Sequence, residues 1–236
     1  MFSTAIRVAK NEGEKFMGRA VEFLLGKGKE RFFVHEKLIR ASSPFFDKVM
    51  SATCLESMQH TGTIQLSEDE PEIFGIYVHW LYYNKLPVCC NEPGCAANQE
   101  YLKLVKAYTL GNKLMDTGFQ NAAIDAIVEK STSAASDGKR YYPVTEVVEY
   151  AYNNTHLLAP IRRLLVDMHV SVGSGKWLDY GNFNSERVPQ RFLFELSSKL
   201  LDLRRGTRAE VKASDYHVHV AADMKMETEK TEMEIF

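Results

Sequence analysis

The chain has 236 residues, of which 45% are hydrophobic and 11% aromatic, which is enough to build a normal core. Its 29 Lys and Arg residues nearly balance 31 Asp and Glu residues, for a net charge of -2. This balance argues against a protein dominated by contacts with a nucleic-acid backbone, which needs a basic face. No apolar run approaches the roughly 20 residues of a membrane helix, and the start of the chain lacks the apolar core of a signal peptide. We therefore expect an intracellular protein, in the cytoplasm or nucleus, with reduced cysteines.

Residues 21–50 predict two strands followed by two helices. Alternating apolar residues in 21–25 and 32–34 favour short strands, and the Gly-Lys-Gly-Lys run between them favours a tight hairpin turn. Helical spacing then begins at His35, where we expect a histidine with a structural, hydrogen-bonded role. Ser43 and Pro44 suit the N-cap and first position of a second helix.

The rest of the chain predicts one more strand and then helices. Residues 63–66 alternate as a strand does, whereas 84–99 contain two prolines and three cysteines and predict a long loop. The small, polar segment 131–138 is typical of a linker, and the acidic C-terminal residues are typical of a solvated tail. The predicted helices lie at about 71–83, 101–114, 116–128, 143–153, 157–172 and 192–203.

Two segments carry a family resemblance. FxVHEKLIRASSPFF, beginning at Phe32, and TIQLSEDEPEIFGIYVHWLYYNKLP, beginning at Thr63, resemble the BTB/POZ domain, and YLKLVKAYTLGNKL with FQNAAIDAIVEK resembles its closing helix pair. The later run APIRRLLVDMHV further resembles the C-terminal extension of BTB proteins common in filamentous fungi. The resemblance implies an α+β fold with a small mixed β-sheet flanked by α-helical hairpins, followed by a helical extension. The implied bounds are 16–131 for the BTB/POZ domain, 132–143 for a linker, 144–205 for the helical extension and 206–236 for a flexible tail.

The resemblance implies protein–protein contact rather than catalysis. We expect a non-catalytic module that self-associates, for example as a homodimer, and binds protein partners, with no membrane and no direct nucleic-acid contact. Mapped onto this sequence, the family's usual geometry places self-association at Leu24, Leu38 and Ile39. It places partner docking at Cys54, Leu55, Glu56 and Tyr82.

Two alternatives stay open for the partner. Family members that dock onto a cullin scaffold carry a hydrophobic-x-Glu motif before the third strand, and Cys54-Leu55-Glu56 stands there. A substrate adaptor of a cullin-RING ubiquitin ligase is therefore the main alternative, with Cys54 where a larger anchor is usual. A transcriptional regulator acting through a DNA-binding partner is the second alternative.

Other motifs have simpler structural explanations. Gly173-Ser174-Gly175-Lys176 lacks the further glycine and the Ser or Thr of a phosphate-binding loop. Cys90, Cys95 and His79 could approach a zinc ion, but no second ligand pair is evident, so we favour free thiols in a mobile loop. Paired arginines, such as those at 162–163, are expected on solvated faces. We expect no catalytic residues, no cofactor and no metal.

Overall fold

The fold is described from a computed structural model, which describes residues 7, 9–51, 63–173 and 188–203. The chain divides into a unit of Met1–Leu200 and a unit of Leu201–Phe236, and only the end of one helix is described in the second. The predicted tail at 206–236 lies outside the described residues. The elements are η1 (Lys10–Phe16), β1 (Ala20–Leu25), β2 (Glu30–His35), α1 (Glu36–Ser42), α2 (Pro44–Val49), β3 (Thr63–Leu66), α4 (Pro71–Tyr83), α5 (Cys95–Lys113), α6 (Thr117–Thr132), α7 (Thr145–Asn154), α8 (Pro160–Val172) and α9 (Gln190–Asp202).

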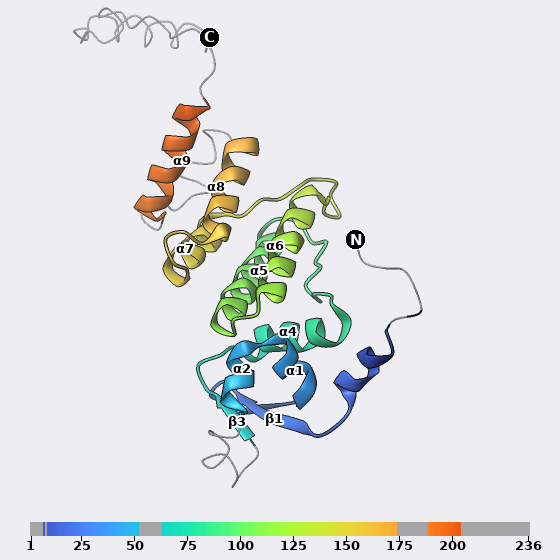
Figure 1. Cartoon of the computed structure of the whole chain (residues 1–236). Coiled ribbons are helices and arrows are strands. Elements are labelled where there is room, and N and C mark those ends of the chain that lie inside the picture. Colours follow the sequence, from blue (N-terminus) through green and yellow to red (C-terminus); the bar gives the residue numbers. More distant parts are fainter. Residues whose placement is uncertain (1–6, 8, 52–62, 174–187, 204–236) are drawn as a thin grey trace, which may run out of the picture. The chain divides into compact units, whose positions relative to one another are not determined.

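The three strands form a small mixed sheet, as the resemblance implied. Their order is β2-β1-β3, with β1 antiparallel to β2 and parallel to β3. Gly26 opens the predicted hairpin turn with φ +64, a backbone conformation that glycine adopts without strain. Figure 1 shows α1, α2 and α4 gathered on one side of this sheet. The predicted α+β class is therefore confirmed.

Aromatic side chains fill the space between the sheet and these helices. Phe23 of β1 is fully buried and lies 5.3 Å, centroid to centroid, from both Phe46 of α2 and Phe74 of α4. Phe32 of β2 meets Phe74 edge to face at 5.4 Å. Each fully buried aromatic contributes roughly 1.5–3 kcal/mol from burial, and such pairs add about 0.5–1.5 kcal/mol. This cluster fixes which face of the sheet points inward.

Buried polar groups set where the helices begin. The Ser43 hydroxyl accepts from the Phe46 N–H at 3.2 Å, which confirms the predicted N-cap, and donates to the Leu114 carbonyl at 2.6 Å. Asp116 caps α6 by accepting from the Phe119 N–H at 2.8 Å. Its other carboxylate oxygen accepts hydrogen bonds from the hydroxyls of Tyr77 and Ser42. Burial, reinforced by this carboxylate, raises the pKa of Tyr77, so the phenol stays a donor.

The predicted loop at 84–99 is too long. Helix α5 begins at Cys95 rather than near residue 101, directly after Gly94, whose φ of +69 lets the chain turn into the helix. The early turn is stabilised by packing, since Ala97 is fully buried, and alanine is the strongest helix former. Prolines and cysteines in the loop obscured this extra helical turn in the sequence.

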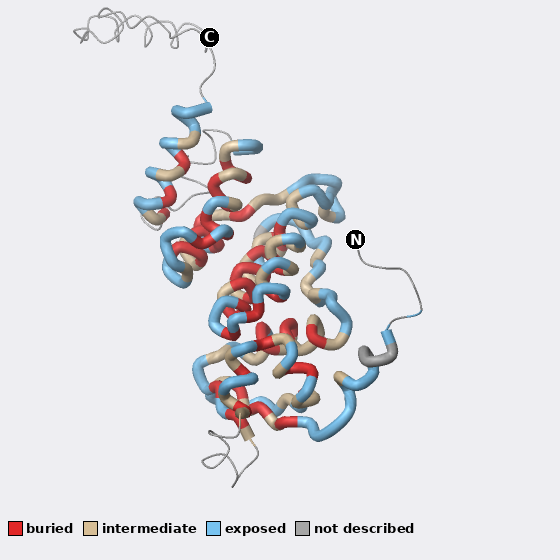
Figure 2. The backbone as a smooth tube through the Cα atoms, in the orientation of Figure 1, coloured by how far each residue is buried: buried red, intermediate tan, exposed pale blue. Residues whose placement is uncertain are grey.

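Helices α5, α6, α7 and α8 form one packed set, in which α6 packs against α5 and α8 packs against α7. Helix α7 packs against α5, and the segment between α6 and α7 is held where the Tyr101 hydroxyl donates to the Tyr141 carbonyl at 2.8 Å. Figure 2 shows that buried residues line α5, α6, α7 and α8. Residues 1–200 form one compact unit, and the predicted linker at 132–143 does not divide it. The predicted domain bounds therefore stay a prediction. Among the described residues, no helix is both long and apolar enough to span a membrane.

Arg162 is not on a solvated face, contrary to the sequence prediction. It is only 8% exposed and donates from Nη2 to the Tyr152 carbonyl at 2.7 Å and from Nε to the Thr155 hydroxyl at 3.0 Å. Its guanidinium lies 4.6 Å from the centroid of the Tyr152 ring. Arg162 therefore joins α8 to the end of α7, whereas Arg163 is exposed as expected.

Candidate interaction surface

The outer face of the sheet carries the side chains that point away from the aromatic core. Burial alternates along β1, and the register pairs Glu22 with Phe33 and Leu24 with Arg31. Phe33 is 61% exposed, an unusual position for a large aromatic side chain in a strand. We call Leu24 and Phe33, with the Glu22–Arg31 ion pair beside them, the outer sheet surface.

Polar contacts hold this surface in a defined shape. The Glu22 carboxylate lies 3.5 Å from an Arg31 guanidinium nitrogen and accepts from the Thr63 hydroxyl at 2.8 Å. These contacts connect β1 to both β2 and β3, so they stabilise the register of all three strands at this surface. Glu22 and Arg31 lie on one diagonal of this register and Leu24 and Phe33 on the other, so the two apolar side chains flank the ion pair.

The three residues predicted for self-association lie in different places. Leu24 is half-buried on the outer sheet surface, where a partner could reach it. Leu38 and Ile39 of α1 are buried in the core of the chain itself, and Ile39 is fully buried. Their burial gives no evidence for a subunit contact, and their predicted role stays a prediction.

Tyr82, predicted for docking, lies at the end of α4 beside the junction of β2 and α1. Its hydroxyl accepts from the His35 N–H at 3.2 Å and lies 2.6 Å from His35 Nδ1. Phe16 of η1 stacks on the Tyr82 ring at 5.8 Å and meets His35 edge to face at 6.2 Å. The structural, hydrogen-bonded role expected for His35 is confirmed. The other three docking residues, Cys54, Leu55 and Glu56, lie outside the described residues.

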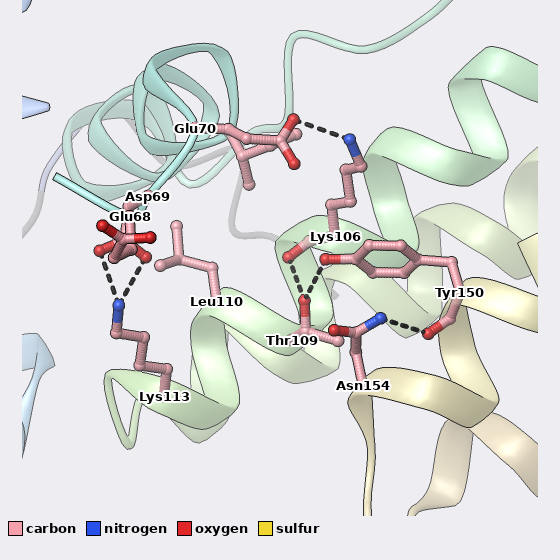
Figure 3. Close-up of a pocket in the computed structure, with 10 residues that line it drawn as sticks. Glu68, Asp69, Glu70, Lys106, Thr109, Leu110, Lys113, Tyr150 and Asn154 are labelled. Atoms are coloured by element: carbon pink, nitrogen blue, oxygen red, sulfur yellow. Dashed lines mark hydrogen bonds and ion pairs between the residues drawn. The ribbon is translucent and has the colours of Figure 1, made fainter. Parts of the chain in front are cut away.

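A polar pocket of about 260 Å³ lies between the start of α4 and helices α5 and α7 (Figure 3). Lys106 pairs with Glu70 at 2.7 Å, and Lys113 contacts both carboxylate oxygens of Asp69 at 2.6 and 2.7 Å. The Lys106 ammonium also lies 5.6 Å from the Tyr150 ring centroid. Each lysine already has an acidic partner, so we assign these groups a structural role that joins α5 to α4.

The cysteine loop is fastened at Cys90 by a nearly buried ion pair. Lys130 lies 2.7 Å from Glu100, and these side chains are 9% and 7% exposed. Glu100 accepts from the Cys90 N–H at 2.8 Å, and Lys130 donates to the Cys90 carbonyl at 3.0 Å. The Cys90 backbone is therefore held by two side chains, and the mobility of the loop stays a prediction.

The described thiols of this loop are those of Cys89 and Cys90, and the Cys95 side chain lies outside the described residues. Cys89 and Cys90 are free thiols, and Nδ1 of His79 already lies 2.8 Å from the Lys85 carbonyl oxygen. Within the described parts of the chain, no group of three or more His, Cys, Asp or Glu side chains could hold a metal ion.

Sequence reasoning missed Phe33 and Phe16 as candidate surface residues. The alternation of β2 placed Phe33 opposite Phe32 and Val34, and an aromatic residue on the solvent side of a strand was the available signal. Phe16 gave no signal, because its partners Tyr82 and His35 are distant in the sequence and no strand or helix pattern was evident around it.

Comparison with known proteins agrees with this architecture. The BTB/POZ domain model matches residues 19–115. No curated protein matches the chain. The matched range contains the mixed sheet, the α1–α2 hairpin, α4 and α5. Residues 19–115 of this chain are therefore a BTB/POZ domain, a fold that mediates protein–protein interaction.

Proposed function

We propose that the chain is a non-catalytic protein–protein interaction module that self-associates through the outer sheet surface. A BTB/POZ domain supports a role in protein–protein interaction. The proposal that this surface self-associates rests on the exposure of Phe33, which shares the outer face of the sheet with Leu24. Contacts among Glu22, Arg31 and Thr63 connect the three strands of that sheet.

Association through this surface would remove the exposed ring of Phe33 from water. Removing an exposed aromatic side chain from water gains on the order of 2 kcal/mol. A second copy presents the same surface, so each contact made across a two-fold axis occurs twice. Two such aromatic anchors in the centre of a small interface favour a reversible homodimer.

Phe33→Lys tests this proposal without disturbing the fold. The new ammonium would lie opposite Glu22 in the β1–β2 register, and opposite charges across an antiparallel pair are favourable. In light scattering of the full chain, we expect Phe33→Lys to lower the molar mass by about a factor of two, from that of a dimer to that of a monomer. Leu158→Lys is the matched control, because Leu158 is 85% exposed and lies outside the sheet. An unchanged mass for Phe33→Lys would refute this role of the surface.

The cullin adaptor remains the alternative proposal. It is supported by the family resemblance and by Cys54-Leu55-Glu56, with Tyr82 as a further contact. An adaptor should retain a purified cullin in stoichiometric amount, and Glu56→Arg should abolish this binding. If wild type and Glu56→Arg both fail to bind cullin, self-association without ligase activity is favoured. A regulator acting through a DNA-binding partner would instead co-purify with that partner from nuclear extract.

A further inference from the structure

Strand β2 lies at an edge of the sheet. The strand order is β2-β1-β3, so one side of β2 pairs with β1, and no strand within the described residues lies along its other side. We call this other side the β2 edge. Glu30, Arg31 and Phe33 of the strand are exposed. An edge strand presents a row of backbone N–H and C=O groups with which another strand can pair.

The hydrogen bonds around β2 show which backbone groups face this edge. The Glu36 N–H donates to the carbonyl of Arg19, just before β1, at 3.1 Å, and this bond continues the β1–β2 register. Hydrogen-bonded positions alternate along an antiparallel pair, so the backbone groups of residues 30, 32 and 34 also face β1. The backbone groups of residues 31, 33 and 35 therefore face the β2 edge.

The β2 edge is limited at both ends. At one end, the His35 N–H already donates to the Tyr82 hydroxyl at 3.2 Å. At the other end, β2 begins at Glu30, directly after the hairpin turn. Between these limits, Arg31 and Phe33 each offer an outward N–H and an outward C=O to a neighbouring strand.

Two copies of the β2 edge complement each other in one antiparallel register. With the two-fold axis beside Phe32, Arg31 of each copy lies opposite Phe33 of the other, and both pairs exchange hydrogen bonds in both directions. Residues 30–34 of one copy then lie along residues 34–30 of the other, so the incoming strand ends before the Tyr82 cap of His35. An axis beside Phe33 would instead set Arg31 against His35, whose N–H is already bonded.

The side chains on the outer face leave this edge open to a second copy. Charged side chains on an edge strand commonly oppose pairing, but the Arg31 guanidinium reaches back to Glu22 of β1, 3.5 Å away, where its charge is compensated. Phe33 is then the exposed side chain nearest the axis. The two Phe33 residues become diagonal neighbours about 7–8 Å apart, which is within reach of aromatic rings.

We propose that two copies of this chain associate edge to edge, with the β2 edge of one copy occupied by the β2 edge of the other. Edge pairing presupposes the self-association proposed above and specifies its geometry, in which two three-stranded sheets become one continuous sheet. A strand of another protein could make the same hydrogen bonds, but the match of the edge to itself in length and register favours a second copy. Residues 30–34 span only about 17 Å, so the contact is small and depends on concentration.

Arg31→Pro and Arg31→Ala form a matched pair for the test. Both remove the ion pair with Glu22, but only proline also removes the outward N–H, which β1 does not need, and an edge strand tolerates proline at such a position. In sedimentation equilibrium of the full chain, we expect Arg31→Pro to have the mass of a monomer at concentrations where Arg31→Ala is still mainly a dimer. Circular dichroism checks that both variants are folded. A folded Arg31→Pro that dimerises as well as Arg31→Ala would overturn edge pairing.

Amide hydrogen exchange followed by NMR locates the contact in the unmodified chain. We expect the amide protons of Arg31 and Phe33 to exchange at least about tenfold more slowly at concentrations where the chain is dimeric than where it is monomeric. The Phe32 amide faces β1 in both states and is the internal reference, so its exchange should change far less. Exchange at Arg31 and Phe33 that does not depend on concentration would overturn edge pairing.

Edge pairing and the proposed self-association can fail separately. If Phe33→Lys lowers the mass but Arg31→Pro does not, the outer sheet surface associates in another geometry, and edge pairing is wrong. If the chain is a monomer at every concentration, both proposals fail. Slow exchange of Arg31 and Phe33 in such a monomer would show that another segment of this chain occupies the β2 edge.

Discussion

The Tyr82 hydroxyl lies 2.6 Å from Nδ1 of His35 and accepts a hydrogen bond from the His35 N–H at 3.2 Å. The hydroxyl can therefore donate to Nδ1, which fits the imidazole tautomer that carries its proton on Nε2. This pair joins the last turn of α4 to the point where β2 becomes α1. It makes Tyr82 a structural residue of the BTB/POZ domain, whatever partner the surrounding surface binds.

Tyr82→Phe should lower the free energy of unfolding by about 1–2 kcal/mol. The substitution leaves the His35 N–H and Nδ1 without this partner but keeps the stacked contact with Phe16. Urea denaturation of the full chain measures the change. Tyr83→Phe is the control, because Tyr83 is 67% exposed. If both variants lose the same stability, the hydroxyl of Tyr82 does not act as described.

Asp116→Ala should be among the most destabilising single substitutions in the chain, at about 3 kcal/mol or more. It removes the α6 N-cap and leaves the hydroxyls of Tyr77 and Ser42 without their acceptor inside the protein. Thermal unfolding followed by circular dichroism measures the loss. Asp116→Asn keeps an acceptor oxygen and should lose less. An Asp116→Ala variant as stable as wild type would contradict the network.

Lys130→Met should destabilise the chain by about 3–5 kcal/mol, because it leaves the Glu100 carboxylate buried without its counter-charge. The double variant Lys130→Met/Glu100→Leu should recover a large part of that loss, since neither side chain is then a buried charge. Urea denaturation of the single and double variants gives the coupling. Purely additive losses would show that the two residues do not act as a pair.

Because His169 is buried, we expect the free energy of unfolding of the chain to fall as the pH drops below about 6.5. Burial holds the pKa of His169 below its usual value, although the contact with the Leu165 carbonyl opposes this shift. The unfolded chain then binds a proton that the folded chain does not, so the stabilising contribution is present above pH 6.5 and is lost as the pH falls toward the lowered pKa.

The corresponding measurement is the free energy of unfolding between about pH 7 and pH 5. His169→Phe removes the titrating group and keeps a ring against Phe192, so its stability should depend less steeply on pH than that of wild type. His156→Phe changes an exposed histidine and is the control. Equal slopes for all three proteins would show that His169 does not contribute.

The sequence predicted elements whose signals are local. The cap at Ser43, the hairpin turn at Gly26 and the alternation of the strands depend on neighbouring residues, and the structure contains all of them. The family resemblance then supplied the mixed sheet and its helices, which periodicity alone does not order in space.

Features that depend on distant partners could not be predicted in this way. Arg162 resembles any surface arginine until the carbonyl of Tyr152 is seen to accept from it, and Glu100 resembles a solvated carboxylate until Lys130 of the next helix lies beside it. The same holds for the candidate surface. Leu24 could be proposed from the family's geometry, but the exposure of Phe33 depends on what the rest of the chain covers.

The molar mass of the full chain over a concentration series tests the central claim most directly, because an interaction module that self-associates must exceed the mass of one chain. Static light scattering should give a mass that rises with concentration to at least twice the 26.9 kDa of one chain. A mass of 26.9 kDa at every concentration would contradict self-association through the outer sheet surface.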